Sequence, residues 1–152
     1  MTGAFTLEEY RSLLELALAA GYSFRSFGDE AEGGILLRHD IDYGPVFMSE
    51  MASLEAELEV RATYCVQVDS PWYSLDDPAS DAAVRAALGA GHWLGLHLDA
   101  NRLGADEVVR RRVAELASEL GERFGTAVRA VSFHMPGRRP LGHLDQIGRA
   151  HF

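Results

Sequence analysis

The side chains best suited to chemistry in this chain are carboxylates and imidazoles that accompany apolar runs. They are His39, Asp40 and Asp42 after one run, His97 and Asp99 at a second, and His134 at a third. Hard or borderline divalent cations bind carboxylate oxygens and imidazole nitrogens. An Asp-x-Asp pair at a strand end aims both carboxylates to one side, because alternate strand residues share a face. The residues therefore predict a divalent-metal site in which His97 joins Asp40 and Asp42.

Three protein ligands would leave coordination positions for water and for a substrate oxygen. A metal ion in such a site polarises a carbonyl group and lowers the pKa of its bound water. The second carboxylate is then placed to act as the general base that takes the proton of the water. The predicted chemistry is metal-assisted hydrolysis.

Each of these residues also has a structural interpretation. Asp42 precedes Pro45 and has the residue type of a helix cap. His97 lies in an apolar segment and would suit a hydrogen-bonded core histidine, and His134 would suit a hydrogen bonder in a loop. His92, between Gly91 and an apolar run, is interpreted as structural. Because several metal-capable groups gather at the same ends of the predicted strands, a shared site is favoured over independent structural roles.

The spacing of apolar residues predicts the elements that position these groups. Helical periodicity covers 6–20, 45–58, 78–88 and 105–124, and strand patterns cover 22–27, 35–37, 62–68, 93–98 and 128–133. Thr6 and Glu9 have the form of a capping box at the first helix. Strands that alternate with helices indicate parallel β/α units, in which ligands bind at the carboxyl ends of the strands.

Length and composition limit the class of protein. With 152 residues, of which 47% are hydrophobic, the chain is long enough for a single domain with its own core. A net charge of −9 argues against nucleic acid as a partner. No apolar run approaches the roughly 20 residues that span a bilayer. The amino-terminal segment lacks the features of a signal peptide, so we expect a cytoplasmic protein without membrane insertion.

Two further features have structural interpretations. The cationic cluster 110–112 lies in a helical pattern ahead of Glu115 and Glu119, which predicts a solvated helix face with ion pairs. The lone Cys65 lies in an apolar run and is expected to be a buried thiol rather than a nucleophile.

Several segments together resemble the polysaccharide-deacetylase family, also called the NodB-homology family. They are 36–42 with its His-Asp-Ile-Asp, 60–64, the Gly-His-Trp-Leu-Gly-Leu-His of 91–97, and the Ser-Phe-His-Met-Pro-Gly of 132–137. Segments 70–73 and 6–27 are similar to a branch of this family found among surface-polysaccharide biosynthesis proteins. The resemblance runs from about Phe5 to Pro136, with the motifs in the family's order.

The resemblance implies an α/β fold, a distorted or incomplete (β/α) barrel with parallel strands. It implies hydrolysis of an acetyl group on an N- or O-acetylated sugar or polysaccharide precursor. Asp40 would be the general base and Asp42 a metal ligand, although the residue between them makes this assignment reversible. His97 would be the first metal histidine. His134 stands where the family has an arginine that orients the base.

The chain departs from the family at several points. The family's second metal histidine is Asn101 here, and Asp99 is an alternative ligand.

The residues expected to contact substrate are His39, Tyr43, Trp72 and Tyr73. The family's later strands are missing from this sequence, so we expect one domain over 1–152 that is a fragment, is closed by a partner, or has an open edge.

The leading hypothesis is therefore a metal-dependent carbohydrate deacetylase that uses zinc, with cobalt or manganese as alternatives. A non-catalytic carbohydrate-binding or regulatory module with the same fold is the second hypothesis, and a truncated, unstable fragment is the third. A homo-oligomer would cover an open barrel edge.

Overall fold

The computed structural model describes residues 6–29, 33–99 and 106–134. Within them, the strands are β1 (Arg38–Ile41), β2 (Thr63–Gln67), β3 (Trp93–Leu98) and β4 (Val128–Phe133). The helices are α1 (Leu7–Ala19), α2 (Ser49–Glu57), α3 (Pro78–Gly89) and α4 (Asp106–Phe124), with a short 3-10 helix, η1 (Pro45–Met48), ahead of α2.

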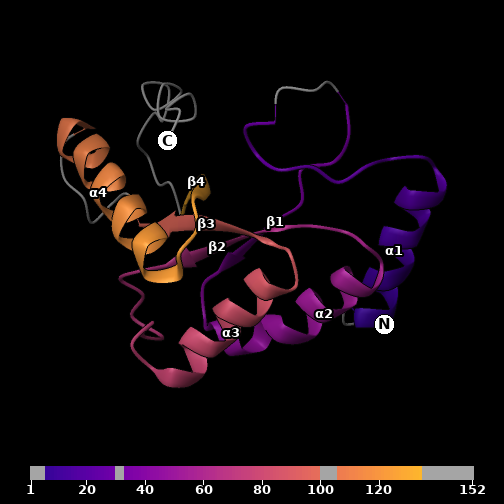
Figure 1. Ribbon diagram of the computed structural model, residues 1–152, viewed down its shortest axis with the longest axis horizontal. Helices are drawn as coiled ribbons and strands as arrows, with labels where there is room; N and C mark the ends of the chain where they lie inside the picture. The colour runs from indigo at the N-terminus through magenta and orange to yellow at the C-terminus, as the bar shows by residue number, and fades with distance from the viewer. Residues whose placement is uncertain (1–5, 30–32, 100–105, 135–152) are drawn as a thin grey trace, which may run out of the picture.

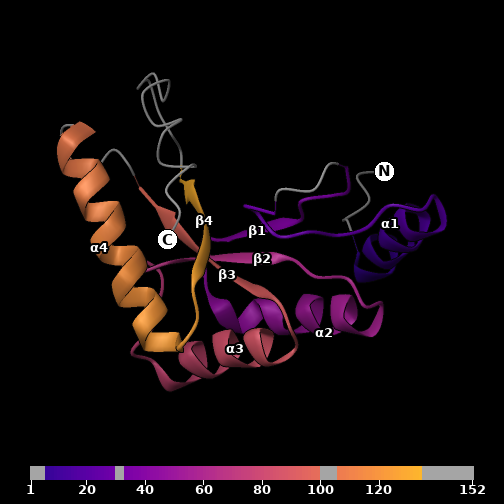
Figure 2. The ribbon, with the colours of Figure 1, turned by 45° about the horizontal axis from the view of Figure 1, so that its top comes forward.

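The described strands form one parallel sheet in the order β1-β2-β3-β4, which is also their order along the chain. Right-handed crossovers between successive parallel strands put the connecting helices on one side of a sheet. Accordingly, α2 and α3 lie below the sheet and α4 lies alongside β3 and β4 (Figure 1). The direction of the strands turns strongly from β1 to β4 (Figure 2). This open parallel α/β fold is consistent with a partial barrel, and it confirms the predicted fold class.

The helix starts follow from their capping residues. The Thr6 hydroxyl accepts a hydrogen bond from the Glu9 amide at 3.2 Å, and the Glu9 carboxylate accepts one from the Thr6 amide at 2.9 Å. This capping box satisfies amide groups that the first turn of a helix leaves unpaired. Asp77 caps α3 in a similar way by accepting from the Ser80 amide at 3.0 Å.

The start of the sheet differs from the sequence prediction. The strand expected at 35–37 begins at Arg38, because β2 begins at Thr63 and Arg38 is the first residue that pairs with it in register. The strand expected at 22–27 is reduced to a single parallel bridge between Phe24 and Ile35. The segment after Pro45 begins as the 3-10 helix η1 before α2 takes over.

Apolar side chains of the sheet and of its helices form the main core. β2 is buried along its whole length, and β3 is buried from Leu94 onward. Val113, Leu116 and Leu120 of α4 are buried in the same cluster as these strands. A smaller apolar cluster joins Tyr10 and other residues of α1 to α2. The central strands are therefore rigidly packed.

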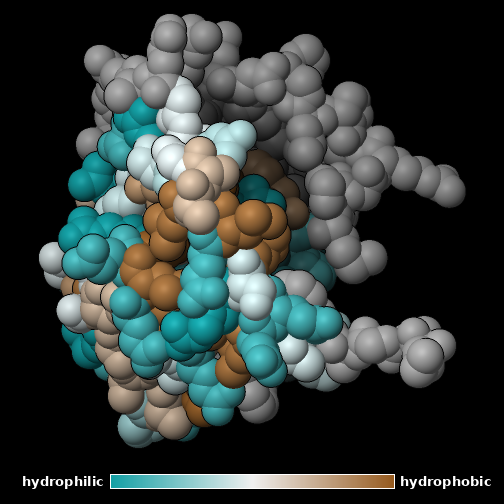
Figure 3. Space-filling view, turned by 90° about the vertical axis from the view of Figure 1, so that its right-hand side faces the viewer, coloured by the Kyte–Doolittle hydropathy of each residue, from teal (hydrophilic) through white to brown (hydrophobic). Residues whose placement is uncertain are grey.

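The surface bears out one sequence interpretation and adds one feature. Arg112 lies 3.3 Å from Glu115 and 3.6 Å from Glu119 on the exposed face of α4, so the cationic cluster forms the predicted ion pairs. On the side of α1, an apolar area lies among hydrophilic surface (Figure 3), and α1 exposes Leu13 and Leu16. No helix in the described part of the chain has the length and apolarity to cross a membrane.

Candidate metal centre

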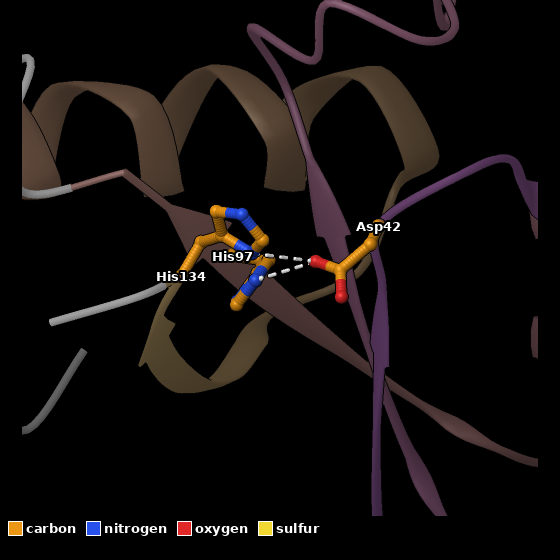
Figure 4. A group of neighbouring side chains, drawn as sticks. All are labelled: Asp42, His97 and His134. Atoms are coloured by element: carbon orange, nitrogen blue, oxygen red, sulfur yellow. Dashed lines mark hydrogen bonds and ion pairs between the residues drawn. The ribbon is translucent and has the colours of Figure 1, made fainter.

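Two imidazole side chains converge on one carboxylate oxygen. Asp42 Oδ1 lies 3.1 Å from His97 Nε2 and 2.9 Å from His134 Nδ1, and the two imidazole rings meet edge to face (Figure 4). The three ligand atoms lie within 4.8 Å of one another. His97 is almost fully buried, whereas Asp42 and His134 are partly exposed. One imidazole therefore forms the floor of the site, and the other two groups stand at its opening.

Each of the three residues comes from a different strand. Asp42 is one residue beyond β1, His97 lies within β3, and His134 is one residue beyond β4, where its amide donates to Leu98 at 2.7 Å and extends the ladder. These positions are at the carboxyl ends of parallel strands, as predicted. β1 runs further than the sequence suggested, because Asp40 lies inside it, whereas β3 matches the predicted 93–98 and contains His97.

A contact between the outer strands shows how strongly the sheet curves. Ser132 of β4 donates a hydrogen bond to Asp40 of β1 at 2.7 Å. In a flat sheet, strands three positions apart are separated by about 14 Å. The concave face therefore brings both ends of the strand order together, and this curvature assembles the site.

Asp40 is held by residues that the sequence analysis did not assign. Its Oδ1 accepts from Ser132, and its Oδ2 accepts from Arg38 at 3.1 Å. Asp40 Oδ1 also lies 3.8 Å from His97 Nδ1. His134, which stands in the place of the arginine expected to orient the base, contacts Asp42 instead. The guanidinium that binds Asp40, the expected base, belongs to Arg38, two residues earlier on the same face of β1. The period of two along the strand is the signal that could have pointed to Arg38.

The donor set suits a divalent ion. Two imidazoles and a carboxylate are the ligands found at three-ligand catalytic zinc sites. Ligands bound at about 2.1 Å to one tetrahedral ion lie about 3.4 Å apart. The separations of 2.9 and 3.1 Å from Asp42 Oδ1 therefore need to open by only a few tenths of an ångström. Asp42, His97 and His134 thus fit such an ion.

The structural interpretation of Asp42 as a helix cap does not hold. The N-cap of η1 is Gly44, and neither η1 nor α2 has a side-chain hydrogen bond at its N-cap. His97 is buried like a core histidine, but its two ring nitrogens face Ser132 and Asp42 on the site side. The polar arrangement is therefore not a by-product of helix capping.

A cleft of about 250 Å³ opens beside the cluster. Its lining residues are Asp42, Gln67, Pro71, Trp72, Asp99 and His134. The Trp72 ring has its centroid 6.0 Å from that of Tyr43, and both side chains are mostly exposed. Trp72 therefore lines the cleft, and the exposed ring of Tyr43 lies next to it. Asp99 lies at the cleft but outside the group of three, and Asn101 lies outside the described residues.

Tyr73 was expected to contact substrate, but its hydroxyl is used within the protein. It accepts from the Gln67 amide at 2.6 Å and donates to the Ile41 carbonyl at 2.9 Å. Burial raises the pKa of Tyr73 to about 12. Tyr73 therefore ties the ends of β1 and β2 together beneath the site.

His39 points to the other side of β1, into a second polar cluster. Its Nε2 lies 2.6 Å from the carboxylate of Glu55, which is fully buried. Glu55 also accepts hydrogen bonds from the hydroxyls of Tyr10 and Tyr64. The structure thus separates His39 from the metal centre. In the sequence, the signal for this second polar cluster is Glu55, an acidic residue at an apolar-face position of α2, three residues after Ala52.

His92 is structural, as predicted. Its Nδ1 accepts from the Ala62 amide at 3.2 Å, so the hydrogen of the neutral ring is on Nε2, which donates to the Ala52 carbonyl at 2.9 Å. Although Nδ1 is 3.6 Å from Glu55, it accepts from Ala62 and carries no hydrogen, so it donates no hydrogen bond to that carboxylate.

Small residues of β2 and β3 lie next to Asp40 in the sheet. Asp40 is in register with Cys65, and Cys65 with Gly95. A Cβ atom at Gly95 would collide with the Cys65 sulfur, so the glycine makes room for the thiol. Burial raises the pKa of Cys65 to about 12, which fits the predicted inert thiol.

Comparisons with known proteins agree with this fold. No family model and no curated protein matches the sequence. The fold is similar to the solved structure of IcaB from Ammonifex degensii, with a TM-score of 0.60 and 14% sequence identity. The match covers 93% of this chain and 72% of the other. At this level of identity the likeness concerns the fold alone, so this chain shares the α/β fold of that structure.

Proposed function

We propose that the protein is a metal-dependent hydrolase that removes an acetyl group from an N- or O-acetylated sugar or polysaccharide precursor. The observation that carries the proposal is the convergence of two imidazoles on Asp42 Oδ1 at the carboxyl ends of three parallel strands. The fold shared with IcaB and the resemblance of several segments to the polysaccharide-deacetylase family support the reaction class.

Asp42, His97 and His134 would hold the ion, and zinc is the proposed metal. In this proposal His134 is a metal ligand rather than the residue that orients the base. The bound ion would polarise the acetyl carbonyl and lower the pKa of water at the site.

Asp40 is the proposed general base. It lies beside the metal ligands, and Arg38 and Ser132 each bind one of its oxygens, which fixes the orientation of the carboxylate. The hydrolysis adds water across the acyl bond and releases acetate together with the sugar amine or hydroxyl. Asp40 takes the proton that water loses on attack, and the same proton is then available for the leaving group.

The cleft supports a sugar ligand. Trp72 lines it with an exposed aromatic ring beside that of Tyr43, and the apolar face of a sugar ring packs against such groups. Gln67 and Asp99 line the same cleft and offer polar partners for hydroxyl groups. The size of the cleft, about 250 Å³, suits one sugar residue with its acetyl group rather than a polymer enclosed along its length.

Zinc binding tests the ligand set. Asp42→Asn should abolish zinc binding measured by isothermal titration calorimetry, because the neutral amide removes the negative charge of the carboxylate that contacts both imidazoles. Asp99→Asn is the matched control, since Asp99 lines the cleft but lies outside the three-ligand group, and this variant should bind like the wild type. A wild-type protein that binds no zinc, cobalt or manganese would refute the metal centre.

Acetate release tests the reaction. The zinc-loaded protein should release acetate from N-acetylated sugars or oligosaccharides, and Asp40→Asn should lower kcat by at least about 100-fold, since general-base catalysis contributes on that order. If the loaded protein bound these sugars without releasing acetate, the non-catalytic module would be the correct interpretation.

A further inference from the structure

Ser132 joins the proposed base to a proposed metal ligand. It is buried in β4, and its hydroxyl oxygen lies 2.7 Å from Asp40 Oδ1 and 2.7 Å from His97 Nδ1. The contacts span 92 and 35 residues of sequence, so neither follows from local structure. One hydroxyl group thus connects β1 with β3 through β4.

The hydrogens of this contact can be assigned from their chemistry. An ionised carboxylate only accepts hydrogen bonds, so the single hydroxyl hydrogen of Ser132 goes to Asp40. The Ser132 oxygen must then accept from His97, which requires a hydrogen on Nδ1. That requirement holds whether the ring is neutral or charged. In the neutral ring, the lone pair is left on Nε2, which is the nitrogen that faces Asp42 at 3.1 Å.

An irregularity in the sheet puts Ser132 at this position. Leu94 pairs with Val128, but Gly95 pairs with Ala130, so Arg129 is an extra residue in β4. With regular pairing, His97 would lie opposite Val131, whereas the shift sets it opposite Ser132. Bulges of this kind redirect side chains near functional sites.

A buried hydroxyl in this sheet is not paired by default. Thr63 of β2 is fully buried, and its hydroxyl has no hydrogen-bond partner among the described residues. The two short contacts of Ser132 are therefore specific to its place between Asp40 and His97, and Thr63 provides a comparison in the same sheet.

We propose that Ser132 is a positioning residue that fixes the hydrogen of His97 on Nδ1, presents Nε2 to the metal, and holds Asp40 beside it. This inference rests on the proposed metal-dependent function. Partners that orient a metal-binding histidine in this way raise metal affinity about 10- to 100-fold.

The test compares Ser132→Ala with two matched variants. Ser132→Thr keeps the hydroxyl, and Thr63→Val removes a buried hydroxyl that has no described partner. Zinc affinity is measured by competition with a chromophoric chelator, and circular dichroism verifies that each variant is folded. Ser132→Ala should weaken zinc binding about 10- to 100-fold, while both other variants stay within a few-fold of the wild type. Unchanged affinity in Ser132→Ala would overturn the proposal, as would an equal loss in Thr63→Val.

A second measurement does not depend on metal. Nitrogen-15 NMR of the metal-free wild type should find a hydrogen on Nδ1 of His97, and a ring with its hydrogen on Nε2 alone would refute the role of Ser132. If the wild type binds no zinc, the proposed function fails. The position of the ring hydrogen still decides whether Ser132 orients His97.

Discussion

Glu55 shows how a buried charge is accommodated in this protein. Burial by itself would raise the pKa of Glu55, but hydrogen bonds from His39, Tyr10 and Tyr64 outweigh it and hold the pKa below its usual value. Burial also raises the pKa values of both phenols, so they remain hydrogen-bond donors. The cluster joins α1 and α2 to the first two strands and anchors the face of β1 opposite Asp40.

Glu55→Gln should lower the free energy of unfolding at neutral pH by about 2–5 kcal/mol, since it removes a buried charge that several donors surround. The folded-state pKa lies below the unfolded value, so the contribution of Glu55 is present above the unfolded pKa of about 4.5. It is lost as the pH falls through the folded-state pKa. Urea titrations between neutral pH and pH of about 3 should therefore show a steeper acid loss in the wild type than in the variant.

The control is Glu57→Gln, on the same helix but exposed and paired with Arg11. It should change stability by no more than about 1 kcal/mol. Equal effects of the two substitutions would show that the buried cluster contributes no special stabilisation.

At the scale of elements, helices and inner strands were largely predictable. Their apolar periods and the capping box at Thr6 are local signals, and they gave boundaries within a few residues. The start of β1 was missed because it depends on where β2 begins. The extra residue in β4 was missed for a similar reason, since a bulge is defined only by pairing with β3.

Gly95 allows β2 and β3 to pack beneath the site. Gly95→Ala should destabilise the fold by about 1–3 kcal/mol, because the new methyl group collides with Cys65 and lies 3.0 Å from Thr63 Cγ2. Chemical denaturation measures the loss, and Cys65→Ala in the same chain should restore part of it. Gly89→Ala is the control, since nothing lies within 4 Å of its Cβ position. If both alanines were tolerated equally, the close approach would be unimportant.

At the scale of the whole molecule, the candidate site draws together both sides of the sheet. Asp42 follows β1, at one side of the strand order, and His134 follows β4, at the other. The sequence predicted that metal-capable residues gather at the strand ends, and the structure brings Asp42, His97 and His134 together there. The sequence did not predict which carboxylate meets which imidazole, because the distances between them depend on the curvature of the sheet.

An ion held by these residues should therefore stabilise the entire fold. Free zinc at about 100 times its Kd should add about 2.7 kcal/mol to the free energy of unfolding. For a chain of this size, that corresponds to a rise in Tm of roughly 5–10 °C. Thermal melts followed by circular dichroism should show the rise in the wild type and not in Asp42→Asn. An equal rise in both proteins would place zinc elsewhere.

The bulge at Arg129 also affects how related chains can be recognised. In a relative whose β4 lacked the extra residue, the serine opposite the equivalent of His97 would come one position earlier, so an ungapped alignment along β4 would set it against Val131 and score it as missing. A search motif should therefore permit one inserted residue between the start of β4 and the Ser-Phe-His segment. Anyone grafting the centre onto an idealised barrel would likewise have to copy the insertion, because the three side chains alone would not reproduce the hydroxyl beneath the imidazole.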